Sequence, residues 1–285
     1  MDADAIQVDQ AHSEADESSA SDAVNRRIWE RPNSLKHYGR LEGFVDPGER
    51  RAFARVRADA GRGRILDIGV GGGRTAAILL AETQDYVGID YTPAMIDICR
   101  TKYPQARFEV EDARDLSRFG DEAFTLVIFS YNGLDVVGEG DRQRVLDEVH
   151  RVLAPGGAFF FSTFNRLGPG FARARLTLRK IDVSQGTRAT LWSLAKYLAG
   201  TAIGLWHRLS MRRFENEAGG GKLRLHPAHD YGILVHTTIL PEARQELAAA
   251  GFAPTIEMFG SSGRALEGNE EARDEEYFHL IARKP

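Results

Sequence analysis

The sequence predicts an α/β fold in which short buried strands alternate with helices around an open, mostly parallel sheet. Apolar runs and helical stretches alternate along most of the chain. The run Ile65–Ile68 breaks into a glycine-rich turn that leads into a helix. Acidic residues end three successive predicted strands, at the spacing of a strand–helix–strand unit. Together these observations favour a ligand site at the carboxyl ends of the strands.

Composition limits the class of protein. With 285 residues, 42% of them hydrophobic, the chain can bury a full core, as one domain plus an insertion. A net charge of -4 gives no reason to expect attraction to nucleic acid. The single cysteine, Cys99, fits a reducing compartment. No run approaches the roughly 20 apolar residues of a membrane span, and no secretory signal pattern is present, so we expect a cytoplasmic protein.

The stretch Arg64–Arg74 predicts a strand, a tight turn and the start of a helix. Its alternate glycines are Gly69, Gly71 and Gly73. A dinucleotide-binding fingerprint needs a glycine at the sixth position from Gly69, where Arg74 stands. Asp67 precedes the turn, and a carboxylate there suits a cationic amino group better than a pyrophosphate.

This turn resembles motif I of the class I S-adenosylmethionine (SAM)-dependent methyltransferases. The next strand, Tyr86–Asp90, ends in an acid that can accept two hydrogen bonds from a ribose diol. The third strand, Ala106–Glu111, is followed by Asp112. The resemblance assigns Asp90 to the ribose hydroxyls of SAM and Asp112 to its adenine amino group. The cofactor-binding residues that we expect are Tyr38, Asp67, Gly69, Gly71, Gly73, Asp90, Tyr91, Met95, Asp112, Ala113, Ser130 and Asn132.

The later elements complete the fold that the resemblance implies. Thr92 and Pro93 start a helix, and Phe124–Ser130 is a nearly continuous apolar run, typical of a central parallel strand. The loop after it resembles motif IV, beside the transferable methyl group, so Tyr131 is a catalytic candidate. The remaining elements are a helix at Asp141–Leu153, a strand from Ala158, a helix at Pro241–Ala250, and strands at Thr255–Phe259 and Glu276–Ala282. In the family the last two strands form an antiparallel hairpin, so we expect a Rossmann-like seven-stranded sheet with helices on both faces.

Four regions follow from these patterns. Residues 1–25 form an acidic segment expected to be disordered. Residues 26–60 form a cap segment in which Trp29 or Tyr38 contacts SAM or simply packs against a helix. Residues 61–165 and 238–285 form the SAM-binding core, and residues 166–237 a helical, substrate-binding insertion or lid.

The insertion is strongly basic, with 12 Lys and Arg residues against three acids between Arg166 and Arg224. Within it, Leu191–Leu209 predicts one or two amphipathic helices. Three interpretations stay open: a lid with a solvated basic face, a lid that binds an acidic or phosphorylated substrate, and a membrane-surface helix that presents a lipid-like substrate.

Three histidines lie near the end of the insertion, at His226, His229 and His236. Their spacing fits no zinc signature, so we expect no metal. His229, next to Asp230, is the candidate general base, and a loop histidine bonded to backbone is the alternative.

The sequence therefore predicts methyl transfer from SAM to an oxygen or nitrogen atom of a small-molecule acceptor. Positioning of the reactants can supply most of the rate, which explains the absence of a catalytic triad. No Asn-Pro-Pro-Tyr motif follows the fourth predicted strand, which argues against nucleic-acid adenine and protein glutamine as targets. The alternatives are a regulatory SAM-binding protein without transferase activity, and a methyltransferase that acts on RNA or on a lipid-like substrate.

Overall fold

The computed structural model describes residues 25–60, 63–172, 200–210, 222–226, 232–268 and 272–285. Residues 1–24 of the expected disordered segment and His229 lie outside these residues, as do positions 191–199 of the predicted amphipathic helices, whereas Asn25 is helical and buried. Residues 200–210 are helical, in agreement with the prediction for that part of the insertion.

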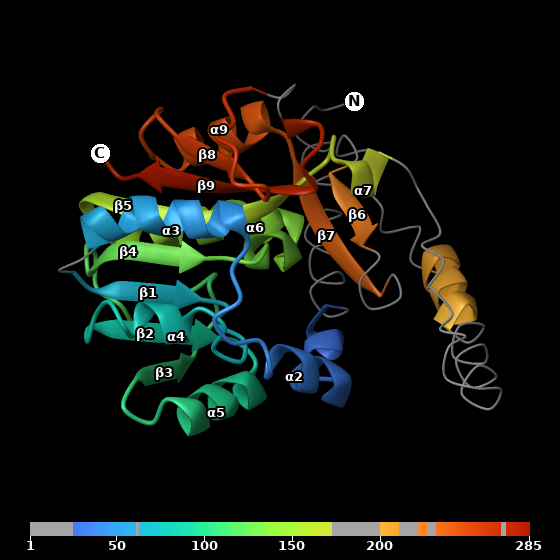
Figure 1. Ribbon diagram of the computed structural model, residues 1–285, viewed down its shortest axis with the longest axis horizontal. Coiled ribbons are helices and arrows are strands. Elements are labelled where there is room, and N and C mark those ends of the chain that lie inside the picture. The colour runs from blue at the N-terminus through green and yellow to red at the C-terminus, as the bar shows by residue number, and fades with distance from the viewer. Residues whose placement is uncertain (1–24, 61–62, 173–199, 211–221, 227–231, 269–271) are drawn as a thin grey trace, which may run out of the picture.

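The predicted mostly parallel sheet is confirmed, but among the described residues it has nine strands in place of the seven that we expected (Figure 1). Five parallel strands follow the order β3-β2-β1-β4-β5, β9 pairs with β5 in the antiparallel sense, and β8 pairs with β9. These strands are β1 (Ile65–Ile68), β2 (Tyr86–Asp90), β3 (Arg107–Val110), β4 (Phe124–Phe129), β5 (Leu153–Asn165), β8 (Glu257–Gly260) and β9 (Tyr277–Arg283). The order places β1 and β4 in the centre, where buried apolar runs are expected.

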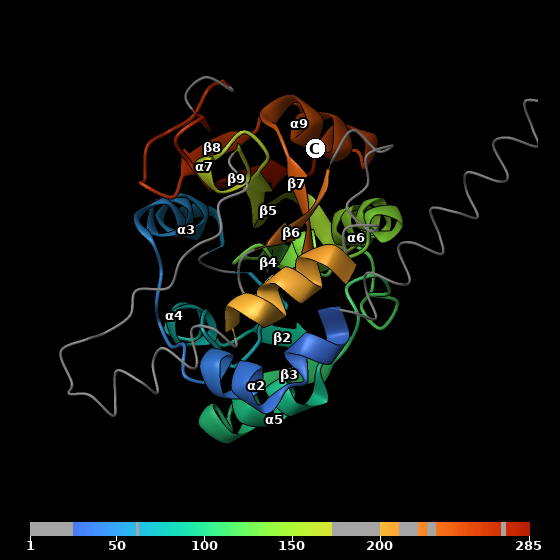
Figure 2. The same cartoon turned by 90° about the vertical axis from the view of Figure 1, so that its right-hand side faces the viewer.

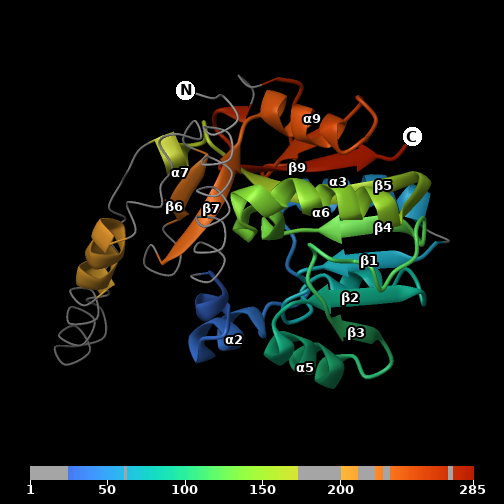
Figure 3. The same ribbon diagram turned by 180° about the vertical axis from the view of Figure 1, so that it is seen from behind.

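Helices cover both faces of this sheet, as Figures 1, 2 and 3 show for α3 and α6. Apolar residues of α3 (Pro47–Ala60), α4 (Ala76–Leu79) and α5 (Pro93–Lys102) pack in one core cluster. Those of α6 (Glu139–Val152) and α9 (Leu240–Ala249) pack in another. Thr92 precedes α5 but makes no side-chain capping bond; its backbone N–H instead donates to Asp90.

The insertion also contributes a β-hairpin that the sequence analysis did not predict. Strand β6 (Leu223–His226) pairs with β7 (Ile233–Thr238) in the antiparallel sense. Phe164 of β5 pairs with β9 on one edge and with β7 on the other. Because β4 lies on that second edge and ends earlier, the long strand β5 leaves room for β7 beyond the carboxyl end of β4.

The N-terminal segment is attached to this hairpin. It comprises a helical stretch at residues 25–29 and the helix α2 (Pro32–Tyr38). Asn25 donates to the carbonyls of Val136 and Leu234 and accepts from the N–H of Leu234. Ile28 packs with Ile233 and Val235 of β7. We call residues 25–38 together with β6 and β7 the cover.

The remaining short elements are the 3-10 helix η1 (Gly133–Val136) and the helix α7 (Pro169–Ala172). Within the part of the chain that the structure describes, every helix is too short or too polar to cross a lipid bilayer.

Candidate functional site

A cavity of about 440 Å³ lies at the carboxyl ends of the central strands and is bordered by residues of the cover. Ten of the predicted cofactor-binding residues line it, and so does Tyr131. They are Tyr38, Gly69, Gly71, Asp90, Tyr91, Met95, Asp112, Ala113, Ser130 and Asn132. Asp67 and Gly73 are not among the lining residues.

The glycine turn after β1 needs its glycines. Gly69, Gly71 and Gly73 have φ values of 63°, 53° and 87°, in the region that favours glycine. A Cβ on Gly69 would lie 2.7 Å from the ring of Phe129. A Cβ on Gly71 would meet no atom within 4 Å, so this glycine leaves open space at the cavity.

Asp90 is held in place by the backbone on both sides. Its Oδ2 accepts a hydrogen bond from Gly71 N–H at 3.0 Å, and its Oδ1 accepts one from Thr92 N–H at 2.8 Å. Burial raises the pKa of this carboxyl group, and the two backbone bonds oppose the shift. The Thr92 side chain also donates to this carboxylate, and the three bonds still leave it acceptor capacity for a further donor. The carboxylate therefore fits a diol.

Asp112 already accepts several hydrogen bonds. Arg114 donates to both of its oxygens, from Nε at 2.9 Å, from Nη2 at 2.7 Å and from its backbone N–H at 3.0 Å. Arg26 of the cover donates to Oδ2 at 2.7 Å. Burial favours the neutral acid, but these bonds outweigh it and lower the pKa of Asp112 to about 2. Both oxygens are saturated, so an adenine amino group could bind here only if one arginine withdraws.

The guanidinium of Arg26 also lies over the ring of Tyr91, with 4.2 Å between its central carbon and the ring centroid. Tyr91 and Met95 are the residues expected to flank adenine, and both line the cavity. A cation of the cover thus contacts the two predicted adenine residues Tyr91 and Asp112.

Asp67 supports the turn from beneath. Its side chain is buried, and Oδ2 accepts from Thr75 Oγ1 at 2.6 Å and from Tyr86 Oη at 2.9 Å. Burial raises the pKa of Asp67 to about 6. Gly73 is not among the lining residues either, and its carbonyl accepts from Tyr103 Oη at 3.4 Å. Direct contact of these two residues with a cofactor remains a prediction.

A buried ion pair that the sequence analysis missed fixes the turn. Arg74 donates to Glu49 Oε2 at 2.8 Å and to Oε1 at 2.6 Å, and also to Ser130 Oγ at 2.8 Å and to the carbonyl of Phe44. These bonds join the turn, the start of α3 and the end of β4. Since the partners lie 25 or more residues apart, no local pattern indicates them.

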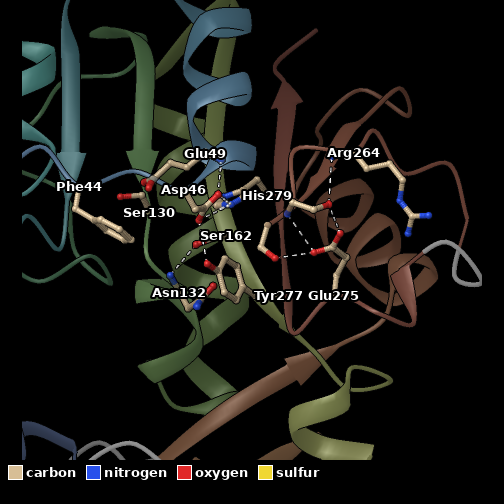
Figure 4. Close-up of polar contacts among 12 residues, drawn as sticks. Phe44, Asp46, Glu49, Ser130, Asn132, Ser162, Arg264, Glu275, Tyr277 and His279 are labelled. Carbon is tan, nitrogen blue, oxygen red and sulfur yellow. Dashed lines mark hydrogen bonds and ion pairs between the residues drawn. The ribbon is translucent and has the colours of Figure 1, made fainter.

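Tyr131 and Asn132 have φ values of 58° and 59°, and two successive non-glycine residues in this region store strain. The Arg74 guanidinium lies 4.8 Å from the centroid of the Tyr131 ring. Asn132 N–H donates to Ser162 Oγ at 2.7 Å (Figure 4). Asn132 Oδ1 is buried and has no hydrogen-bond partner among the described residues. An orphaned acceptor in a strained, cavity-lining residue is typical of a ligand site.

The rest of the cavity wall is mainly apolar and comes from the cap segment, the η1 region, β5, β6, β7 and the start of β9. We call this wall the acceptor part. The wall formed by the carboxyl ends of β1, β2 and β3 is called the nucleotide part. The apolar residues of the acceptor part are Trp29, Phe44, Val136, Val137, Phe164, Ile233 and Val235. Its polar residues are His226, Glu276 and Tyr277. Tyr277 Oη lies 3.0 Å from Asp46 Oδ2, and Asp46 Oδ1 lies 3.1 Å from His279 Nε2 (Figure 4).

Of the three predicted histidines, the structure describes His226 and His236, and they lie in different surroundings. The ring of His226 lies 4.6 Å from that of Phe164 at the cavity. His236 is fully buried, with Nε2 3.6 Å from Glu246 Oε1. The described residues contain no group of three or more side chains able to hold a metal ion.

Residues 65–157 match the sequence model of a family described as "Methyltransferase domain". A ubiquinone/menaquinone biosynthesis C-methyltransferase, UbiE, of a Geobacter species is 34% identical over 114 residues, which cover 37% of this chain and 47% of the relative. The chain carries a class I SAM-dependent methyltransferase domain. The domain implies SAM as its cofactor.

Two more proteins resemble this chain over a larger share of its length. A ubiquinone biosynthesis O-methyltransferase of Pseudomonas syringae pv. tomato is 25% identical and covers 66% of this chain and 78% of its own. An S-adenosylmethionine-dependent methyltransferase from Mesorhizobium loti has the same fold, with a TM-score of 0.54, 22% identity, and 82% and 98% coverage of the two chains. The chain spans about half the length of curated relatives such as UbiE.

The residues present fit SAM. Asp90 offers lone pairs to a diol, Gly71 leaves room for a ligand at the turn, and Asn132 offers an orphaned acceptor. Asp112 fits less directly, because Arg26 and Arg114 already saturate it.

Proposed function

We propose that this protein transfers the methyl group of SAM to an oxygen or nitrogen atom of a small, largely apolar molecule. The observation that best supports this proposal is the composition of the cavity wall. The carboxylate of Asp90 and the apolar acceptor part line one cavity of about 440 Å³, a usual size for a small-molecule site. A cofactor bound to Asp90 and a methyl acceptor bound against the acceptor part would therefore meet inside the same cavity.

In this proposal, the residues of this chain bind the two reactants, orient them and exclude water. Asp90 would hold the ribose, Tyr91 and Met95 the adenine, and the turn at Gly69 and Gly71 the amino-acid end. When bound, SAM supplies a methyl group on a sulfonium sulfur that leaves as a neutral thioether. The strained pair Tyr131 and Asn132 would border the reacting atoms. Rate then depends chiefly on alignment and on a dry enclosure.

The relatives do not decide which atom receives the methyl group, since one is named a C-methyltransferase and another an O-methyltransferase. His229 remains the predicted general base. If methyl transfer in a His229→Ala variant equals that of the wild type, the acceptor needs no such base.

A lipid-like acceptor is the second candidate, because the helix at residues 200–210 exposes four large apolar side chains. These are Ile203, Leu205, Trp206 and Leu209, with 48% to 69% of each exposed. The basic insertion would favour an anionic surface. Flotation with vesicles of anionic or neutral lipid tests this candidate: binding to the anionic vesicles that is lost in Trp206→Ala supports it, and absence of binding contradicts it.

Calorimetry with SAM and S-adenosylhomocysteine is the first test of the proposed function. We expect binding at micromolar concentrations. The second step is incubation with labelled SAM and hydroxylated or amino-bearing aromatic compounds. Failure of both ligands to bind would contradict the proposal. Binding without transfer to any acceptor would favour the regulatory alternative.

A further inference from the structure

Tyr277 stands at the start of β9 and lines the acceptor part of the cavity. Its hydroxyl lies 3.0 Å from Asp46 Oδ2, in the loop that leads into α3 (Figure 4). Asp46 Oδ1 also accepts from Glu49 N–H at 2.8 Å and lies 3.1 Å from His279 Nε2. The carboxylate of Asp46 is thus fixed by three groups, only one of which reaches the cavity.

The direction of the bond between Tyr277 and Asp46 follows from the charge on Asp46. Burial works against that charge, but hydrogen bonds from His279, Glu49 and Tyr277 outweigh burial and hold the pKa of Asp46 below its usual value. Asp46 is therefore ionised near neutral pH and has no hydrogen to donate. Burial and the neighbouring Asp46 also raise the pKa of Tyr277, so its hydroxyl keeps its hydrogen. Tyr277 donates, and Asp46 accepts.

This assignment leaves Tyr277 Oη with lone pairs and no hydrogen for a ligand. A ligand group that meets it must itself donate, because two acceptors facing each other would both lack a hydrogen bond. Asn132 Oδ1 is a second buried acceptor in the cavity wall without a partner among the described residues. The surrounding wall includes the rings of Trp29 and Phe164, which suit a flat apolar body.

We propose that Tyr277 is a specificity-determining residue that selects methyl acceptors with an O–H or N–H donor on an aromatic body, and rejects those with only an ether or carbonyl. This inference rests on the proposed function and specifies its substrate class. Carbon methylation of a molecule without such a donor is disfavoured by the same geometry.

A matched pair of ligands tests the inference without turnover: a naphthol and its methyl ether, which share one apolar body and differ in the donor. Binding is measured by calorimetry on the full chain saturated with S-adenosylhomocysteine. We expect the naphthol to bind roughly 10-fold tighter than the ether, because a site built to receive a donor leaves a buried acceptor unpaired when the donor is missing.

Tyr277→Phe should bring the two affinities to within about twofold, since it removes the lone pairs and keeps the ring. Asp46→Asn is the second variant. Its amide can donate to Tyr277 Oη and release the tyrosine hydrogen towards the cavity, so the preference should fall or reverse in favour of the ether. Tyr103→Phe is the control, because its hydroxyl contacts Glu42 and Gly73 outside the cavity lining and its loss should leave the preference unchanged.

The outcomes separate the two proposals. Loss of preference in Tyr277→Phe with an unchanged affinity for S-adenosylhomocysteine supports the inference. Equal binding of naphthol and ether to the wild type, an unaltered preference in Tyr277→Phe, or binding of neither ligand overturns it. If S-adenosylhomocysteine itself fails to bind the wild type, the proposed function fails first.

Discussion

The nucleotide part and the acceptor part of the cavity are built in different ways. In the nucleotide part, Asp90 is fixed by Gly71 and Thr92, which lie 19 and 2 residues away along the chain. The acceptor part depends on distant contacts: Asn25 of the cover binds Leu234 across 209 residues, and Tyr277 binds Asp46 across 231 residues. The contacts that fix Asp90 are short-range along the chain, whereas those of the acceptor part form only when distant segments dock. Substitutions in the acceptor part should therefore change ligand preference while cofactor binding persists.

The largest effect is expected for Asp90→Ala in the nucleotide part. The change removes both ribose acceptors and the anchor of the glycine turn. We expect SAM affinity to fall about 100-fold, the effect of losing two hydrogen bonds to a charged group. Calorimetry measures it, with Asp97→Ala as the control, because the Asp97 side chain is 75% exposed on α5. Equal affinities for the wild type and Asp90→Ala would show that the ribose binds elsewhere.

Asp67→Asn tests whether Asp67 supports the turn without touching the ligand. Its pKa of about 6 exceeds the usual value of 3.8, so the folded state binds more protons between these values and stability falls as the pH rises from about 4 to 6. The wild type should lose roughly 2 kcal/mol relative to Asp67→Asn over this range. Urea unfolding at several pH values measures the difference.

If the free energy of unfolding of the wild type and that of Asp67→Asn change in parallel with pH, the burial of Asp67 has no energetic consequence. A fall in SAM affinity as large as that of Asp90→Ala would instead show that Asp67 contacts the cofactor, and the distinction drawn between these two acids would be lost.

Ile233→Ala tests the acceptor part. Ile233 lies on β7, lines the cavity and packs against Ile28. Loss of its apolar area should weaken naphthol binding about 10-fold while the affinity for S-adenosylhomocysteine changes less than twofold. Val110→Ala on β3, outside the cavity lining, is the control. If the affinities for naphthol and for S-adenosylhomocysteine fall by similar factors, the acceptor part and the nucleotide part do not bind their ligands independently.

Arg26→Ala tests the contact between the cover and the nucleotide part. Arg26 occupies a lone pair of Asp112, and its side chain is one-third exposed, so its ion pair is partly screened. Its removal frees Asp112 for an adenine amino group, and we expect SAM affinity to rise about threefold. Weaker binding measured by calorimetry would show that Arg26 holds the cofactor instead of competing with it.

The sequence predicted much of the nucleotide part because its signals are local. The strand Tyr86–Asp90 coincides with β2, and the glycines of the predicted tight turn have positive φ values. Asp90 and Asp112, the acids that follow or end the second and third predicted strands, both line the cavity, since parallel strands end at the same edge of the sheet. Asp67 departs from this pattern because it lies within β1 and its side chain is buried beneath the turn.

By itself, the sequence determined the alternation of strands and helices, the glycine turn and the position of Asp90, because each depends on residues a few positions apart or on the period of a strand or helix. Only the tertiary structure decided which segments form the acceptor part. The hairpin of β6 and β7, the anchor at Asn25 and the bond from Tyr277 to Asp46 join residues that share no period. Such contacts become favourable only when the sheet has already brought the two backbone segments together. No short stretch of the chain therefore predicts them.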